Sequence, residues 1–507
     1  MIIDRSWNKY EQRLSISYID KAGNRQIYSK SLHHWKTYEY SYNGEYHTWN
    51  DRKCNKIFKD ATNYSPNEFD MLEYMYEMDP QILSQLHAIN SPKIYFWDIE
   101  TEISNEFPDP NIANQRVTSI SLVGPDMSCM VLGLHDMDEQ KKNTLKDKYI
   151  AWINNNKFAK SKCQGTPKVI YQAFNTEDAL LNHWMTKVMP RISCLAGWNS
   201  YNFDWNYIFH RCIRLFGEAT TYKMIRNISP TRELTSIRYE QSLSHHETIT
   251  VPRHMMFVDY MLLVKQYDYT LRPYESYSLD WVSEHAVNAN KIKYQGTLQD
   301  LYEKDYEQYY FYNAIDSLLI LLIHMRLKCI EYPCALSAVT LVPYQAAQGQ
   351  IAVTTANVFE EFYNDNKHVV WDYDAIPRFK VEYEGAFCGA VPGLYEYTVC
   401  DDFASLYPSQ IRTCNFSFEN FMHKYSDIDD FGRRVELTWT EDELNKFKED
   451  PQYFISINNH VYKNDKDYAF KKMQTRLAKL RNYYKYTGQD IESELIDEVD
   501  KLIKSKE

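Results

Sequence analysis

The sequence lacks several features that would place it in a specialised class of proteins. Its 507 residues include 10 cysteines but no Cys-x₂-Cys pair, so neither a zinc ribbon nor a disulfide framework is indicated. No apolar run reaches the length of a membrane span, and the first residues lack the apolar core of a signal peptide. We therefore expect a protein of a reducing cytoplasm, with no membrane contact.

The sequence also lacks an excess of positive charge. The formal net charge is −12, so no overall basic field attracts nucleic acid. Binding to DNA or RNA would need local basic patches, or metal ions that screen an acidic site. Tyrosine is abundant, at 43 residues, and its rings either stack on bases or fill apolar cores. The length predicts three or four domains, each able to bury a core.

Two acids interrupt the apolar, strand-like stretch 93–101. Side chains alternate across a strand, so Asp98 and Glu100 lie on one face, two residues apart. Burying two neighbouring carboxylates is costly unless a cation or a proton holds them together, and Mg²⁺ and Mn²⁺ take such oxygen ligands. The alternative is an edge strand with a solvated acidic face, and the spacing alone leaves both interpretations open.

Two further acidic positions follow along the chain. A loop with Gly and Asn precedes Asp204, which begins a helical pattern that ends near Gly217. A second helical pattern, over 303–328, places Tyr312 and Asp316 one turn apart on one face. The alternatives are a helix N-cap for Asp204 and an ordinary polar edge beside a core for the Tyr312–Asp316 pair.

The chain resembles the DnaQ-like 3′–5′ exonucleases at three ordered motifs: Asp98-x-Glu100, Asn199-x₃-Phe203-Asp204 and Tyr312-x₃-Asp316. The resemblance implies an RNase H-like domain whose four carboxylates hold two Mg²⁺ or Mn²⁺ ions about 4 Å apart. One ion would activate water, and the other would stabilise the leaving 3′ oxygen. It also implies that Tyr312 orients the attacking water, and that Asn199 and Phe203 contact DNA.

The resemblance continues after the nuclease motifs. The segment 383–387, which includes Tyr383, Gly385 and Ala386, looks like the Tyr-x-Gly-Gly/Ala junction of family B DNA polymerases, and those three residues are its implied DNA contacts. The likeness is nearest to the polymerases of T-even-type phages. It covers most of the chain after about residue 90.

Residues 397–409 are similar to motif A of family B, Asp-x-x-Ser-Leu-Tyr-Pro-Ser, with a strand expected to end at Asp402. The resemblance implies that Asp402 is a catalytic acid and that Asp402 and Phe403 belong to a metal site. It also implies nucleotide contacts at Ser405, Leu406 and Tyr407. A plain strand and turn with an exposed acid is the alternative.

Two motifs of a complete family B polymerase do not occur in the sequence. These are the Lys-x₃-Asn-Ser-x-Tyr-Gly pattern of a fingers helix and the Asp-Thr-Asp of a palm hairpin. A thumb is also not recognised. One of the two palm acids is therefore missing, and Asp402 alone cannot build a two-metal polymerase site.

A basic helix is predicted over 467–486. In it Arg481 and Lys485 reproduce the Arg-x₃-Lys spacing that the family uses for an incoming triphosphate. In a competing register of the motif, Arg476 is the arginine. A solvated basic face is the alternative. After a break at Gly488, a second helical pattern carries an apolar stripe, formed by Ile491, Leu495, Ile496, Val499, Leu502 and Ile503. We expect this stripe to pack on the preceding helix, on itself or on a separate polypeptide.

Together these patterns predict a multidomain protein of the α/β and α+β classes. The expected parts are an N-terminal domain over 1–92, to which 329–372 return, an RNase H-like exonuclease domain over 93–328, a partial palm over 373–457 and partial helical fingers over 458–507.

The sequence favours the N-terminal subunit of a split family B replicative DNA polymerase with a 3′–5′ proofreading exonuclease. Its expected partners are primer-template and single-stranded DNA, dNTP, replisome proteins and a second chain with the remaining palm, fingers and thumb. We expect it in the cytoplasm, that of an infected bacterial host if the chain is phage-encoded. The alternatives are a stand-alone editing exonuclease with a DNA-binding palm remnant, a non-catalytic nucleic-acid-binding remnant, and an artificial truncation.

Overall fold

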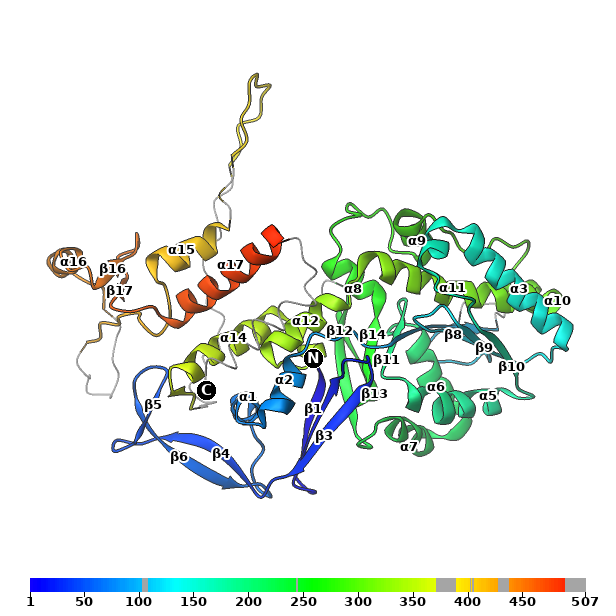
Figure 1. Cartoon of the computed structure of the whole chain (residues 1–507), viewed down its shortest axis with the longest axis horizontal. Helices are drawn as coiled ribbons and strands as arrows, with labels where there is room; N and C mark the ends of the chain where they lie inside the picture. Colours follow the sequence, from blue (N-terminus) through cyan, green and yellow to red (C-terminus); the bar gives the residue numbers. More distant parts are fainter. Residues whose placement is uncertain are drawn as a thin grey trace. The chain divides into compact units, whose positions relative to one another are not determined.

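The computed structural model divides the chain into two compact units (Figure 1). The first comprises Met1–Ser31 and Asp79–Val353, and the second Leu32–Met78 and the described residues of Thr354–Glu498. The structure describes residues 1–102, 108–242, 245–370, 389–401, 403, 405–426 and 437–487.

A six-stranded mixed sheet is the centre of the first unit. Its strand order is β10-β9-β8-β7-β11-β14. β7 runs antiparallel to β8 and parallel to β11, and β11 runs parallel to β14. The strands are β7 (Ile94–Thr101), β8 (Val117–Val123), β9 (Cys129–Gly133), β10 (Val169–Ala173), β11 (Cys194–Gly197) and β14 (Met256–Asp259).

Helices cover both faces of this sheet (Figure 1). Because side chains alternate across a strand, Phe96 joins one apolar core and its neighbour Trp97 joins the other. The Phe96 side is covered by α3 (Glu139–Asn155), α4 (Lys157–Lys162), α8 (Tyr260–Tyr267), α9 (Leu279–Val287), α10 (Leu298–Lys304) and α11 (Tyr306–Leu327). The Trp97 side is covered by α5 (Glu177–His183), α6 (Asp204–Phe216) and α7 (Glu218–Ile228).

A smaller antiparallel sheet completes the first unit, in the order β1-β2-β3. Ser337 in the helix that follows α11 exchanges hydrogen bonds with the backbone of Ile2 in β1. Two antiparallel strands, β12 and β13, form a hairpin in which Ile237 pairs with Ile249. These elements are β1 (Ile2–Asn8), β2 (Arg13–Ile19), β3 (Arg25–Ser31), α2 (Pro80–His87), β12 (Leu234–Ser242), β13 (His245–Pro252), α12 (Glu331–Thr340) and α13 (Tyr344–Ala347).

The second unit combines a four-stranded sheet, in the order β15-β5-β6-β4, with a helical part. An apolar cluster with Val358, Phe362 and Met473 joins its two longest helices, α14 (Gln350–Asn364) and α17 (Ala469–Thr487). Its other elements are β4 (His34–Tyr40), β5 (Tyr46–Thr48), β6 (Lys53–Asp60), α1 (Glu68–Tyr76), β15 (Lys367–His368), α15 (Leu406–Cys414), α16 (Glu441–Lys448), β16 (Tyr453–Ile455) and β17 (Val461–Lys463).

The mixed α/β class is confirmed, whereas the strand expected to end at Asp402 is wrong for the described residues. Residues 389–401 contain no strand. Tyr397 is 99% and Val399 87% exposed, and a strand forms only where a neighbour completes its hydrogen-bond ladder. None of the helices in the described ranges is both long and apolar enough to cross a membrane.

Candidate metal centre

The strand β7 carries the first two candidate acids in the middle of the sheet. It lies between β8 and β11, so the alternative of an edge strand with a solvated acidic face is wrong. Asp98 and Glu100 lie on the Phe96 face, as the alternation predicts. The ladder between β7 and β8 shifts register between Glu100 and Thr101, and such bulges re-aim side chains beside functional sites.

The helix α11 brings Asp316 to the same place. One carboxylate oxygen from each of Asp98, Glu100 and Asp316 lies within 4.8 Å of the others. The Asp316 residue is only 1% exposed, and Glu100 is 9% exposed. The helix predicted over 303–328 is present with a break at Asp305, which caps α11 by accepting a hydrogen bond from Gln308 N–H.

Asp204 reaches the centre from the start of α6. The N-cap position of this helix is Phe203, so the alternative of an N-cap role for Asp204 is wrong. Instead, Asp204 Oδ1 accepts a hydrogen bond from the backbone N–H of Ile99 at 3.1 Å. Ile99 lies between the two acids of β7, and this bond therefore fixes Asp204 next to them.

Asn313 is a residue of the centre that the sequence motifs did not reveal. Its Nδ2 donates to Asp98 Oδ2 at 2.8 Å, and its Oδ1 accepts from Ser119 Oγ at 2.7 Å. The amide thus holds one carboxylate oxygen of Asp98 in place. A sequence signal does exist, because Asn313 is a polar residue three positions before Asp316, and residues three apart lie on the same face of a helix.

Lys291 is the second residue that the motifs did not assign. It lies in the loop between α9 and α10, and its Nζ is 2.5 Å from Asp316 Oδ2 and 3.1 Å from the hydroxyl of Tyr312. Its own backbone N–H donates to Asp280 Oδ1 at 2.7 Å. An ammonium group is therefore held against the acids by the fold of this loop.

Burial governs the protonation of the acids. It raises the pKa of Glu100 to about 8, with the charge of Asp316 adding to the effect, and raises the pKa of Asp204 to about 7. Burial and the charges of Asp204, Asp316 and Glu100 raise the pKa of Asp98 well above its usual value. Carboxylates that cannot all ionise together near neutral pH form a centre that a divalent cation would stabilise.

The residues present fit a divalent metal ion. Asp316 Oδ1 is buried, and no described residue offers it a hydrogen bond. A buried carboxylate oxygen without a partner costs free energy that a bound cation would recover. The donors are all carboxylate oxygens, which Mg²⁺ and Mn²⁺ prefer.

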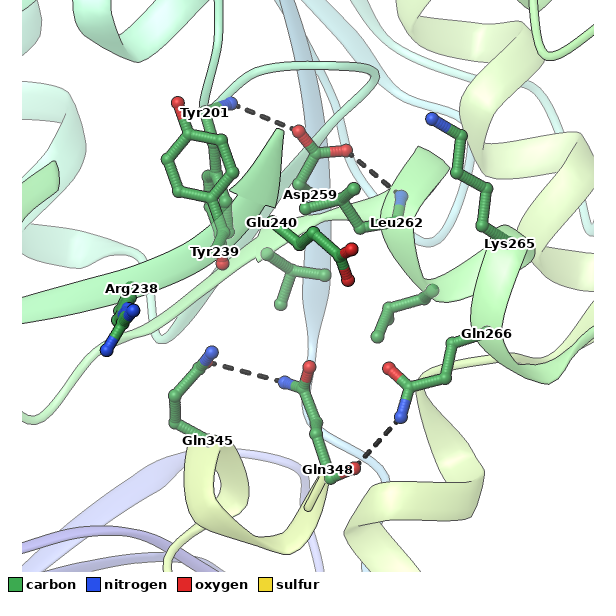
Figure 2. A pocket seen from close by; sticks show the side chains of 12 residues that line it. Tyr201, Arg238, Tyr239, Glu240, Asp259, Leu262, Lys265, Gln266, Gln345 and Gln348 are labelled. Carbon is green, nitrogen blue, oxygen red and sulfur yellow. Dashed lines mark hydrogen bonds between the residues drawn. The ribbon is translucent and has the colours of Figure 1, made fainter. Parts of the chain in front are cut away.

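A further buried acid, Asp259 at the end of β14, organises the loop before α6. Its carboxylate accepts hydrogen bonds from the backbone N–H groups of Asn199 at 3.2 Å and Tyr201 at 3.1 Å. Figure 2 shows the bond from Tyr201 and a further one from Leu262. Asp259 also lines an open cavity of about 580 Å³ with Gln345 and other polar residues.

The predicted polymerase residues are only partly described. Phe403 and Tyr407 are 79% and 69% exposed, and Leu406 at the start of α15 is partly exposed. The Ser405 residue precedes α15. The residues Asp402, Tyr383, Gly385 and Ala386 lie outside the described residues, as do the apolar stripe of 491–503 and the side chains of Arg481 and Lys485.

Arg476 has partners within its own unit. Its guanidinium donates to Glu361 Oε1 at 3.1 Å and Glu360 Oε2 at 2.9 Å, both on α14. These bonds tie α17 to α14. A role for Arg476 in binding a triphosphate stays a prediction.

Comparison with known proteins relates these features to DNA polymerases. Residues 49–282 match the sequence model of the exonuclease domain of DNA polymerase family B. The DNA-directed DNA polymerase of Escherichia phage RB69 is 30% identical over 329 residues, which are 63% of this chain and 33% of that protein. The DNA-directed DNA polymerase of Enterobacteria phage T4 is 26% identical over 264 residues, which are 51% of this chain and 28% of that protein.

A more distant relative is the DNA polymerase delta catalytic subunit of Plasmodium falciparum, 25% identical over 369 residues, which are 66% of this chain and 32% of that protein. The aligned part of the chain thus spans about a third of each of these relatives. The family match ends before Tyr312 and Asp316, so their place in the centre rests on the packing of α11 against β7.

Proposed function

We propose that this chain removes nucleotides from the 3′ end of single-stranded DNA, because residues 49–282 match the sequence model of the exonuclease domain of DNA polymerase family B. The observation that supports this most directly is the convergence of Asp98, Glu100 and Asp316, with Asp204 fixed beside them by Ile99 N–H. We further propose that the domain has an RNase H-like fold and proofreads newly made DNA.

In this proposal the four acids hold two divalent metal ions. Mg²⁺ or Mn²⁺ bound there would supply an activated water and stabilise the leaving 3′ oxygen. Tyr312 offers a hydroxyl that can orient the attacking water, and Asn313 keeps Asp98 in position. Asn199 and Phe203, in the loop before α6, are proposed contacts for the DNA strand.

The test uses the purified chain and single-stranded DNA labelled at its 5′ end, with Mg²⁺ or Mn²⁺. We expect a ladder of products shortened from the 3′ end. The double substitution Asp98→Ala with Glu100→Ala should remove this activity. A matched double variant, Asp147→Ala with Glu284→Ala, changes two exposed acids elsewhere in the same unit and should keep it. Equal rates for the two double variants would contradict the assignment.

A second proposal concerns DNA synthesis, because residues 397–409 resemble the family B motif A. We propose that Asp402 binds catalytic metal, that Phe403 to Tyr407 contact the dNTP, and that Tyr383, Gly385 and Ala386 contact primer-template DNA. The second palm acid and the fingers lysine are missing from these 507 residues, so synthesis needs residues from elsewhere. We propose that a second chain supplies them.

Primer extension tests this second proposal. We expect no templated addition by these 507 residues alone, and addition once a polypeptide with the Asp-Thr-Asp and Lys-x₃-Asn-Ser-x-Tyr-Gly motifs is present. Purification from the native source with identification of bound chains shows whether that polypeptide is separate. Processive synthesis by the pure 507-residue chain would overturn this proposal.

A further inference from the structure

The ammonium group of Lys291 lies against an acid that a metal ion at this centre would also contact. Its Nζ lies 2.5 Å from Asp316 Oδ2, and Asp316 is one of the three carboxylates that converge within 4.8 Å. Lys291 thus forms an ion pair with a member of this cluster.

The fold holds this lysine in position from several sides. Its backbone N–H donates to Asp280, at the start of α9. The next residue, Ile292, packs against the apolar core on the Phe96 side of the sheet. The ring of Tyr294 meets the ring of Tyr312 edge to face, with centroids 5.5 Å apart. These contacts order the loop between α9 and α10, and the ordered loop directs the side chain of Lys291 to the acids.

We infer that Lys291 is an internal counter-cation of the acid centre, which keeps the metal-free site folded and lowers its affinity for divalent metal ions. This inference rests on the proposed function, because it concerns the same carboxylates. Its physical basis is that a fixed positive charge beside Asp316 repels a dication and competes for the same oxygen. Both effects are stronger in a partly buried site than in open water.

The alternative is that Lys291 assembles the site and so increases metal affinity. The two roles predict opposite signs. If Lys291 competes with the metal, Lys291→Met should bind Mn²⁺ more tightly; if Lys291 assembles the acids, the same variant should bind it more weakly.

The test is calorimetric titration of the full chain with Mn²⁺ after treatment with EDTA. For Lys291→Met we expect the affinity to rise about tenfold or more relative to the unmodified chain. Lys291→Arg keeps the charge and should stay within about threefold of the unmodified chain. Lys293→Met removes an exposed lysine two residues further along the same loop and should leave the affinity unchanged.

Thermal unfolding gives an independent readout. In EDTA, Lys291→Met should unfold at a lower temperature than the unmodified chain, and Mn²⁺ should raise its unfolding temperature by a larger increment. If circular dichroism shows that Lys291→Met is unfolded, Lys291→Gln takes its place under the same criteria.

The outcomes separate this inference from the proposed function. If Asp98→Ala with Glu100→Ala binds Mn²⁺ as well as the unmodified chain, the proposed metal centre is wrong. If that double variant loses Mn²⁺ but Lys291→Met shows equal or weaker affinity than the unmodified chain, the counter-cation role is wrong and the metal centre stands.

Discussion

Asp204 and Ile99, 105 residues apart in the chain, are joined by a hydrogen bond from the Ile99 N–H to Asp204 Oδ1 at 3.1 Å. The bond connects the first turn of α6 to the strand that carries Asp98 and Glu100. It explains how an acid from a helix on one side of the sheet reaches a centre completed by α11 on the other side.

Loss of a single acid of the candidate centre should reduce the proposed exonuclease activity by several orders of magnitude. Asp316→Ala removes a carboxylate that the proposed two-metal site needs, and no described neighbour supplies a replacement. The rate is measured on 3′ ends of single-stranded DNA at saturating Mg²⁺. Glu284→Ala, an exposed acid on α9, is the control, and a loss below tenfold in Asp316→Ala would contradict the prediction.

Tyr312→Phe should slow cleavage by about 10²-fold, because it removes the hydroxyl that we propose positions water and leaves the carboxylates in place. Mn²⁺ affinity, measured by calorimetry, should change little. A large loss of affinity in this variant would show instead that Tyr312 supports the fold of the centre, through its contact with Lys291.

Asp259→Asn should disturb the centre from a distance. One carboxylate oxygen of Asp259 accepts a hydrogen bond from the N–H of Asn199, and the other accepts one from the N–H of Tyr201. In the asparagine variant an N–H₂ group replaces one of these oxygens and faces an N–H donor that it cannot bind. The loop before Asp204 should then shift, and we expect a 10- to 100-fold lower rate, roughly the effect of a small misplacement. Asp126→Asn, an exposed turn residue that also accepts a backbone N–H, is the matched control. Equal rates in both variants would mean that Asp259 does not position Asp204.

Asp402→Ala should separate the two proposed activities. Because Asp402 belongs to the segment that resembles motif A, and the proposed exonuclease acids are Asp98, Glu100, Asp204 and Asp316, the exonuclease rate should stay near normal. In the presence of the completing polypeptide, primer extension should fall by several orders of magnitude. A parallel loss of exonuclease activity would show that the two sites are not separate.

Stability should decrease below pH 6.5 through His324. Burial lowers the pKa of this histidine to about 3, against about 6.5 in an unfolded chain. The folded state therefore binds fewer protons than the unfolded state between these values. The stabilisation is complete above about pH 6.5 and is lost as the pH falls toward 3, by at most about 1.4 kcal/mol per pH unit.

The unfolding temperature of the chain and of His324→Gln, measured from pH 7.5 to 5, checks this prediction. The unmodified chain should lose stability more steeply than the variant as the pH falls. His285→Gln, on the exposed face of α9, should follow the unmodified chain. Parallel curves for the chain and His324→Gln would contradict the prediction.

Local pattern was enough to predict the parts of the candidate centre. Strand alternation puts Asp98 and Glu100 on one face, and helical spacing puts Tyr312 and Asp316 on one face. The hairpin over β12 and β13 was also predictable, because alternation within a short segment specifies its pairing. These features depend on neighbours a few residues away, and the local geometry of the chain determines them.

Only the tertiary structure decided how these parts meet. The packing of α11 against β7 brings Asp316 to Asp98 and Glu100, over a separation of more than 200 residues, and the same packing places Asn313 at the centre. The loop between α9 and α10 adds Lys291. The strand expected to end at Asp402 is absent from the described residues 389–401 for a related reason, since a strand requires a neighbour that its own residues do not specify. Contacts between distant segments depend on the whole set of buried surfaces, which no local spacing encodes.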